Sequence, residues 1–233
     1  MIITNLKQFN SVCKEMQKFC KKPKDVKVEQ IYHNVFFMNK NEMCATNGKF
    51  MAIRNMSDCI INNEMFVFPC NIKPTKYVTS DGEKFIIESK RDDYFNDEKK
   101  VVTNFDWKSV VPINKPKITK EYNFSDYNPT KISLERYSEV KFCSNGDVIF
   151  DYQDYYETVG IYSDVQITKD DFFDLIDNME IKEVCFPMYQ IYWILNNNKN
   201  FIYNEYEEID GYNPPREFLT SEYKFLLNGM YNQ

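Results

Sequence analysis

Residues 28–55 alternate runs of β-branched and aromatic side chains with tight turns, and this pattern restricts the fold more than any other part of the chain. The stretch reads VEQIYHNVFFMNKNEMCATNGKFMAIRN, with one turn at Asn39–Asn41 and a second at Asn47–Gly48. An Asn-Gly pair favours the two-residue turn of a β-hairpin because both residues accept positive φ angles. The stretch therefore predicts consecutive antiparallel strands joined by hairpin turns.

Strand and helix signals continue along the rest of the chain. Further strands are predicted at residues 65–69, 83–89, 101–104, 132–142, 147–152, 157–163, 183–195 and 200–206. The segment TKDDFFDLIDNM, capped by Thr168, predicts a helix with an acidic outer face, whereas residues 216–227 fit either a helix or a strand. Because both halves mix short antiparallel strands with one or two helices, the predicted fold class is α+β.

An amphipathic helix is predicted at the N-terminus, with Asn5 as its cap and Pro23 as its stop. Its apolar residues recur at helical spacing and line one face: Leu6, Phe9, Cys13, Met16 and Cys20. Four lysines gather on the side away from that face: Lys7, Lys14, Lys18 and Lys21. This basic face is either an ordinary solvated surface or a stripe that contacts nucleic-acid phosphates without reading bases.

The two halves of the chain carry opposite net charge. Residues 1–118 hold 20 lysines and arginines against 14 acidic residues, a net +6, whereas residues 119–233 hold 9 against 21, a net −12, which together give the −6 of the chain. Pro112 and Pro116 favour extended backbone at this break, as in a linker. We therefore expect two domains, 1–118 and 119–233, with a polyanion near the first or a basic partner near the second.

No catalytic or cofactor site is recognisable in the sequence. The 6 glycines form neither a GxGxxG nor a Walker loop, and the single histidine, His33, lies in a strand-like run. We interpret the 7 cysteines, mostly set among apolar residues, as reduced core thiols rather than zinc ligands. We therefore expect a protein that is not an enzyme and binds no metal or cofactor.

Neither a membrane span nor a secretion signal is recognisable, since no run approaches about 18 apolar residues. The expected location is cytoplasmic, which would be the host cytoplasm for a phage or viral protein, with no membrane partner. One further stretch, YNEYEEIDGYN at residues 203–213, interleaves aromatic and acidic residues. It fits either a patch for a basic protein partner or an edge strand with its turn, and we favour the edge strand.

Two segments of the first half resemble the middle domain of the bacterial DNA polymerase III beta subunit, the sliding clamp. The family's Ala-Thr-Asp-Gly-His-Arg-Leu-Ala motif is matched by Ala45, Thr46, Asn47, Gly48, Lys49, Phe50, Met51 and Ala52. The family's aromatic domain ending is matched, in the same order and at similar spacing, by Phe105, Asp106, Trp107, Val110 and Pro112. Lys49 and Phe50 replace the family's histidine and arginine. The resemblance covers residues 1–118, and residues 119–233 match only in general pattern.

The resemblance implies two clamp-like domains and a DNA polymerase processivity factor that encircles duplex DNA. It implies DNA contacts for the basic-face residues Lys7, Lys14, Lys18 and Lys21. It also implies a pocket for short linear motifs of DNA polymerase or other clients, formed by Thr46, Gly48, Lys49, Met51 and Pro112. By analogy with two-domain clamps, the homo-oligomer would be a trimeric ring. The alternatives are a clamp-fold adaptor or transcription-associated factor that does not encircle DNA, and an enzyme whose site the sequence does not reveal.

Overall fold

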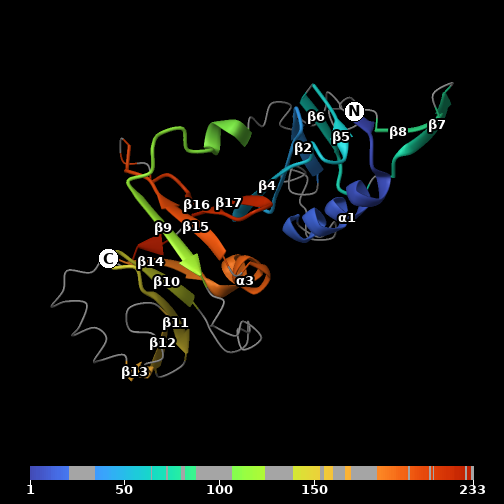
Figure 1. Ribbon diagram of the computed structural model, residues 1–233. Coiled ribbons are helices and arrows are strands. Elements are labelled where there is room, and N and C mark those ends of the chain that lie inside the picture. The colour runs from blue at the N-terminus through green and yellow to red at the C-terminus, as the bar shows by residue number, and fades with distance from the viewer. Residues whose placement is uncertain are drawn as a thin grey trace, which may run out of the picture. The chain divides into compact units, whose positions relative to one another are not determined.

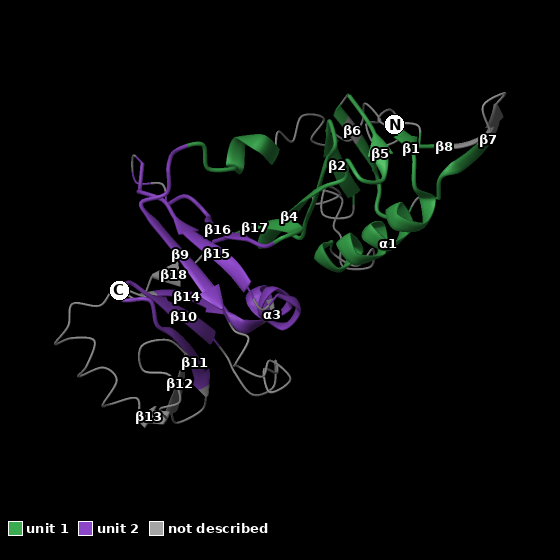
Figure 2. Ribbon diagram, viewed as in Figure 1, with its two compact units in different colours: residues 1–113, 221–226 green, residues 114–220, 227–233 purple. Residues whose placement is uncertain are grey.

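The chain forms two compact units in a computed structural model (Figure 2). The structure describes residues 1–20, 35–63, 65–71, 73–79, 82–87, 107–123, 139–152, 155–159, 166–168, 183–198, 200–209, 211, 213–228 and 230–231. The first unit comprises residues 1–113 and 221–226, and the second comprises residues 114–220 and 227–233. Where the sequence suggests a single division near residue 118, the first unit ends at residue 113 and also takes in a segment from near the C-terminus.

The described strands of the first unit form antiparallel sheets (Figure 1). One sheet has the order β5-β1-β8-β7, which is Ile60–Ile61, Ile2–Ile3, Gly82–Ile86 and Thr75–Thr79. The other has the order β6-β2-β3-β4-β17, which is Met65–Pro69, Val35–Asn39, Glu42–Thr46, Phe50–Asn55 and Tyr223–Leu227. Both predicted hairpin turns are confirmed, and each holds a residue with positive φ, Lys40 at 52° and Gly48 at 85°.

The N-terminal helix is present but shorter than the sequence predicts. α1 spans Leu6–Met16, and the Asn5 side chain caps it by accepting a hydrogen bond of 3.1 Å from the main-chain nitrogen of Gln8. The chain then tightens into a 3₁₀ turn, η1, at Gln17–Phe19. The helix therefore ends well before Pro23, which lies outside the described residues, as do the predicted strand at 101–104 and His33.

The second unit also consists of antiparallel strands with one described α-helix (Figure 2). One sheet has the order β13-β12-β11-β10-β14-β18, which is Gln166–Thr168, Tyr155–Val159, Val148–Tyr152, Glu139–Cys143, Glu183–Pro187 and Met230–Tyr231. The strands β16, β15 and β9 lie side by side in that order and span Arg216–Leu219, Asn200–Glu205 and Ile118–Asn123. The predicted α+β class is confirmed.

The strand predicted at residues 183–195 is wrong beyond Pro187. Strand β14 ends at Pro187, and Met188–Asn197 form helix α3, which packs against β14 and β10. Ile, Tyr and Trp in this segment have strand propensity, which tertiary context overrides. The buried side chains of Met188, Ile191 and Ile194 recur every third residue and place one face of the helix in the core.

The structure tests two of three further predictions for the second half, and the third lies outside the described residues. Residues 216–227 form two strands, β16 and β17, rather than a helix. The edge-strand interpretation of residues 203–213 is wrong, because β15 lies between β16 and β9 and ends at Glu205. Thr168 is the last residue of β13, and the acidic helix predicted after it lies outside the described residues.

Candidate functional site

The turn between β3 and β4 is held together by side chains of its own residues. The buried Thr46 hydroxyl donates to the Phe50 carbonyl at 2.8 Å and accepts from the Gly48 main-chain nitrogen at 3.1 Å. The Asn47 side-chain oxygen accepts from the main-chain nitrogens of Lys49 at 2.9 Å and Phe50 at 3.1 Å. Asn and Thr side chains commonly stabilise turns in this way. The tip formed by Gly48 and Lys49 is consequently fixed in shape while it is exposed.

Met51 joins this turn to the hydrophobic core of the first unit. It lies opposite Thr46 in the β3–β4 ladder and is only 6% exposed. Its side chain belongs to a buried cluster whose other members are Val35, Phe37, Cys44, Ile53, Trp107 and Leu226. The cluster therefore gathers side chains from β2, β3, β4 and β17 around the tryptophan of η5, the 3₁₀ turn Trp107–Val110.

Pro112 lies at the end of the segment that carries Trp107. Val110 and Val111 pack against the same cluster as Met51, and half-buried Pro112 follows them directly. Lys108 places its ammonium 4.6 Å from the centre of the Trp107 ring and forms an ion pair with Glu42 on β3. Two segments that are some 60 residues apart in the sequence thus share one core, which no local sequence pattern reveals.

We expect Thr46→Val to lower the free energy of unfolding by about 1–2 kcal/mol, because valine keeps the shape but removes both hydroxyl bonds from a buried position. Urea denaturation of the variant and the wild type measures this difference. Thr119→Val, at an exposed position of β9, is the matched control and should change the value by less than about 0.5 kcal/mol. An equal effect of the two substitutions would contradict a stabilising role for the Thr46 hydroxyl.

The basic face of the N-terminal helix is exposed where the structure describes it. Lys7 and Lys14 on α1 and Lys18 on η1 are all exposed, whereas Lys21 lies outside the described residues. Because η1 winds more tightly than an α-helix, Lys18 lies about 40° further around the axis than a continuous α-helix would place it. The face is therefore broader than the sequence predicts, and it remains available to a partner.

The opposite side of this helix is anchored in the core of the first unit. Phe9, Val12, Met16 and Phe19 are buried, and the predicted apolar stripe lacks two of them, Val12 and Phe19. The Phe19 ring meets the Phe50 ring edge-on, with centroids 5.4 Å apart, directly after the Thr46 turn. Half-buried Glu15 lies close to Tyr223, and burial together with this carboxylate raises the pKa of the Tyr223 hydroxyl. Glu15 therefore lies beside β17 rather than among the lysines.

The described residues offer little for metal chemistry. Among them, no group of three or more His, Cys, Asp or Glu side chains is arranged to hold a metal ion. All seven cysteines carry free thiols, and burial raises the pKa of the Cys13 thiol to about 12. In the same part of the chain, no helix has the length and apolar character needed to cross a membrane.

No family model and no curated protein matches this chain. Solved structures do match it. A beta clamp of Helicobacter pylori, bound to a DNA ligase peptide, has a TM-score of 0.58 at 10% sequence identity. DNA polymerase III beta subunits of Thermotoga maritima and Borrelia burgdorferi have TM-scores of 0.56 and 0.55, both at 12% identity. The fold is that of a beta clamp.

These similarities extend over both halves of the chain but not over the whole of the clamps. They cover 98%, 99% and 100% of this chain and 65%, 65% and 63% of the Helicobacter, Thermotoga and Borrelia chains. The chain thus spans less than two thirds of the length of the clamps that it matches. At 10–12% identity the similarity shows the fold alone. It confirms the clamp-like fold that the two matched segments of the first half imply.

Proposed function

We propose that this chain is a sliding-clamp-like processivity factor that binds duplex DNA and short peptide motifs, without enzymatic activity. The observation that carries the proposal is the exposed row of Lys7 and Lys14 on α1 and Lys18 on η1, in the first unit of a clamp-like fold. Lysines on flexible side chains attract phosphates without fixing a register or reading bases. Such contacts suit a protein that must stay on DNA and still move along it. Lys21 is proposed to extend the row.

The proposed peptide site is the surface around the Thr46 turn. Gly48 and Lys49 present exposed main-chain and ammonium groups. Met51 belongs to the core cluster beneath, and half-buried Pro112 follows Val111, which packs against that cluster. Thr46 fixes the turn from within. A peptide with an apolar side chain and a polar main chain would find both kinds of contact here. The DNA ligase peptide bound to the Helicobacter clamp supports this kind of client.

Encirclement requires a ring, and the mass in solution tests it. With two clamp-like units per chain, we propose a trimer by analogy with two-domain clamps, with a mass of about 84 kDa, three times 28.0 kDa. Light scattering across a dilution series measures this mass. A persistent species of 28.0 kDa would contradict encirclement and leave only open binding to DNA.

We expect Lys7→Glu, Lys14→Glu and Lys18→Glu together to weaken duplex DNA binding by about thirtyfold at low salt, because three phosphate contacts become repulsive. The slope of log K against log salt concentration should fall by about 2.7, since each lost contact contributes about 0.9. Fluorescence anisotropy with a labelled duplex at several salt concentrations measures both quantities. Circular dichroism checks the fold, which exposed substitutions should preserve.

The matched control reverses three other exposed lysines of the first half: Lys40, Lys73 and Lys115. It carries the same change in net charge, so it separates the basic face from a general charge effect. Equal losses in the two triple variants would exclude a specific role for the helix. Unchanged binding in both would remove the proposed DNA contact altogether.

A second candidate function is a clamp-fold adaptor that binds proteins but not DNA. It is favoured by the net charge of −12 over residues 119–233, which would repel DNA phosphates and attract a basic partner. The anisotropy experiment distinguishes the two functions. Absence of salt-dependent duplex binding by the unmodified chain would support the adaptor.

A further inference from the structure

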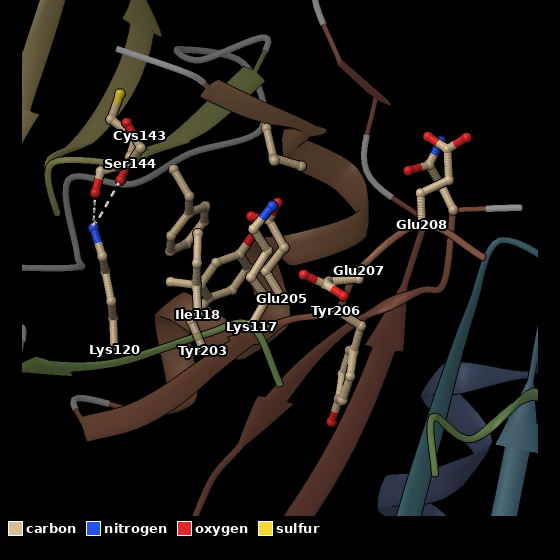
Figure 3. Close-up of a pocket in the computed structure, with 13 residues that line it drawn as sticks. Lys117, Ile118, Lys120, Cys143, Ser144, Tyr203, Glu205, Tyr206, Glu207 and Glu208 are labelled. Carbon is tan, nitrogen blue, oxygen red and sulfur yellow. Dashed lines mark hydrogen bonds between the residues drawn. The ribbon is translucent and has the colours of Figure 1, made fainter. Parts of the chain in front are cut away.

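The second unit contains a pocket of about 480 Å³ that neither proposed contact uses (Figure 3). It lies between β9 and β15 on one side and β10 and β14 on the other, and residues after β15 reach its rim. Its volume is in the range that binds small ligands or a few side chains of a peptide. All of its lining residues belong to the second unit.

The floor of this pocket is apolar and aromatic. Phe142 and Tyr203 are both buried, and their rings stack with centroids 5.0 Å apart and planes at 15°. Ile118 and Val184 complete the apolar lining. Aromatic rings at the base of a pocket offer apolar contact to a side chain that enters it.

The lysine at one end of the pocket, Lys120, already forms hydrogen bonds with main-chain carbonyls of the protein. The Lys120 ammonium donates hydrogen bonds to the main-chain carbonyls of Cys143, at 3.2 Å, and Ser144 (Figure 3). Burial lowers the pKa of this ammonium. Lys120 thus supports the β10–β11 turn, and an acidic ligand would have to displace carbonyl oxygens to reach it.

The carboxylates at the other side are more accessible. Glu207 and Glu208 follow β15 and are exposed, and Figure 3 shows them on the opposite side of the pocket from Lys120. Glu205 is only partly available, since its carboxylate accepts from the Tyr203 hydroxyl at 3.2 Å and lies 3.8 Å from the Arg216 guanidinium. One exposed lysine, Lys117, also lies on this rim and partly offsets the negative charge of the glutamates.

We propose that this pocket binds a linear peptide segment of a partner protein in which an arginine or lysine stands beside an apolar residue. The apolar side chain would rest on the Phe142–Tyr203 floor, and the cation would meet Glu207 and Glu208 at the rim. Tyr203, Tyr206, Glu207 and Glu208 of the stretch 203–213 would then act together at this concave surface. The proposal goes beyond DNA binding and the Thr46 turn, and it does not depend on either.

A fluorescein-labelled hexapeptide of alternating arginine and leucine is the probe, with fluorescence polarisation on the full chain as the measurement. We expect Glu207→Gln with Glu208→Gln to weaken binding about fivefold, as expected from losing two exposed charge pairs. Ser144→Trp, at an exposed position on the rim, should weaken it by at least a similar factor because the indole narrows the entrance. Glu121→Gln, an exposed glutamate of β9 outside the pocket, should stay within about twofold.

Two control peptides make the outcome decisive. A peptide with serine in place of leucine should bind more weakly, because it makes no apolar contact with Phe142 and Tyr203. A peptide with glutamate in place of arginine should not bind. Unchanged affinity in both the double glutamine and Ser144→Trp variants would overturn the proposal, and so would equal or tighter binding of the glutamate peptide. Each variant is checked by circular dichroism. Lys73→Glu, at an exposed position of the first unit outside both proposed sites, should leave the affinity unchanged. Duplex binding is measured separately, so failure here is distinct from failure of the proposed clamp function.

Discussion

Replacing Trp107 with alanine is expected to lower the free energy of unfolding by about 3–5 kcal/mol, the range for truncating a large buried aromatic side chain. Trp107 is 1% exposed and lies among Met51, Phe37 and Leu226 in the core cluster of the first unit. Removing the indole leaves a cavity where side chains of β2, β3, β4 and β17 meet. Urea denaturation followed by circular dichroism measures the loss.

The control for this prediction is Ile113→Ala, only six residues away. Ile113 is 94% exposed, so the change should stay within about 0.5 kcal/mol. Trp107→Phe should fall between the two, because the smaller ring refills part of the cavity. A loss below about 1 kcal/mol for Trp107→Ala would show that the cluster does not pack as described. Peptide binding at the proposed Thr46 site should weaken along with stability, since Met51 belongs to the same cluster.

The hairpins of the first unit follow from local chemistry, which explains why the sequence predicts them. The Asn47 side chain accepts hydrogen bonds within the turn, and Gly48 adopts the positive φ that the turn needs. The pairing of β3 with β4 therefore depends on adjacent residues alone. Helix α3 shows the opposite case. Its strand-prone residues become helical because Met188, Ile191 and Ile194 must face β14 and β10, a contact that no local rule supplies.

Some residues of the candidate sites can likewise be predicted from local sequence. Helical spacing predicts the exposed lysines of α1 and η1, and the matched motif indicates Thr46 and Gly48. The packing beneath these residues cannot be predicted from local sequence, because it joins residues that are far apart in the chain. Phe19 contacts Phe50, 31 positions later, and Leu226 shares a cluster with Trp107, 119 positions earlier. The pocket of the second unit depends even more on tertiary structure. Its aromatic floor pairs Phe142 with Tyr203, and only the sheet arrangement brings them together.

Glu217→Ala is expected to lower the free energy of unfolding by about 3 kcal/mol, because it removes one acceptor that serves two buried donors. Glu217 on β16 is 4% exposed. Its carboxylate accepts from the Asn204 amide at 2.7 Å and from the Tyr206 hydroxyl at 2.9 Å. Alanine would leave both groups without this acceptor in the interior, where such groups cost about 1–3 kcal/mol each. Thermal and urea denaturation measure the loss.

A second readout separates this network from a simple loss of volume. Burial, and after it the hydrogen bond to Glu217, raises the pKa of the Tyr206 hydroxyl. Glu217→Ala should therefore bring that pKa back toward its ordinary value, as followed by the ultraviolet absorption of tyrosinate against Tyr206→Phe. Glu217→Gln keeps an acceptor oxygen and should lose only about 1 kcal/mol. If alanine and glutamine proved equally destabilising, charge rather than hydrogen bonding would hold β15 and β16 together at this point.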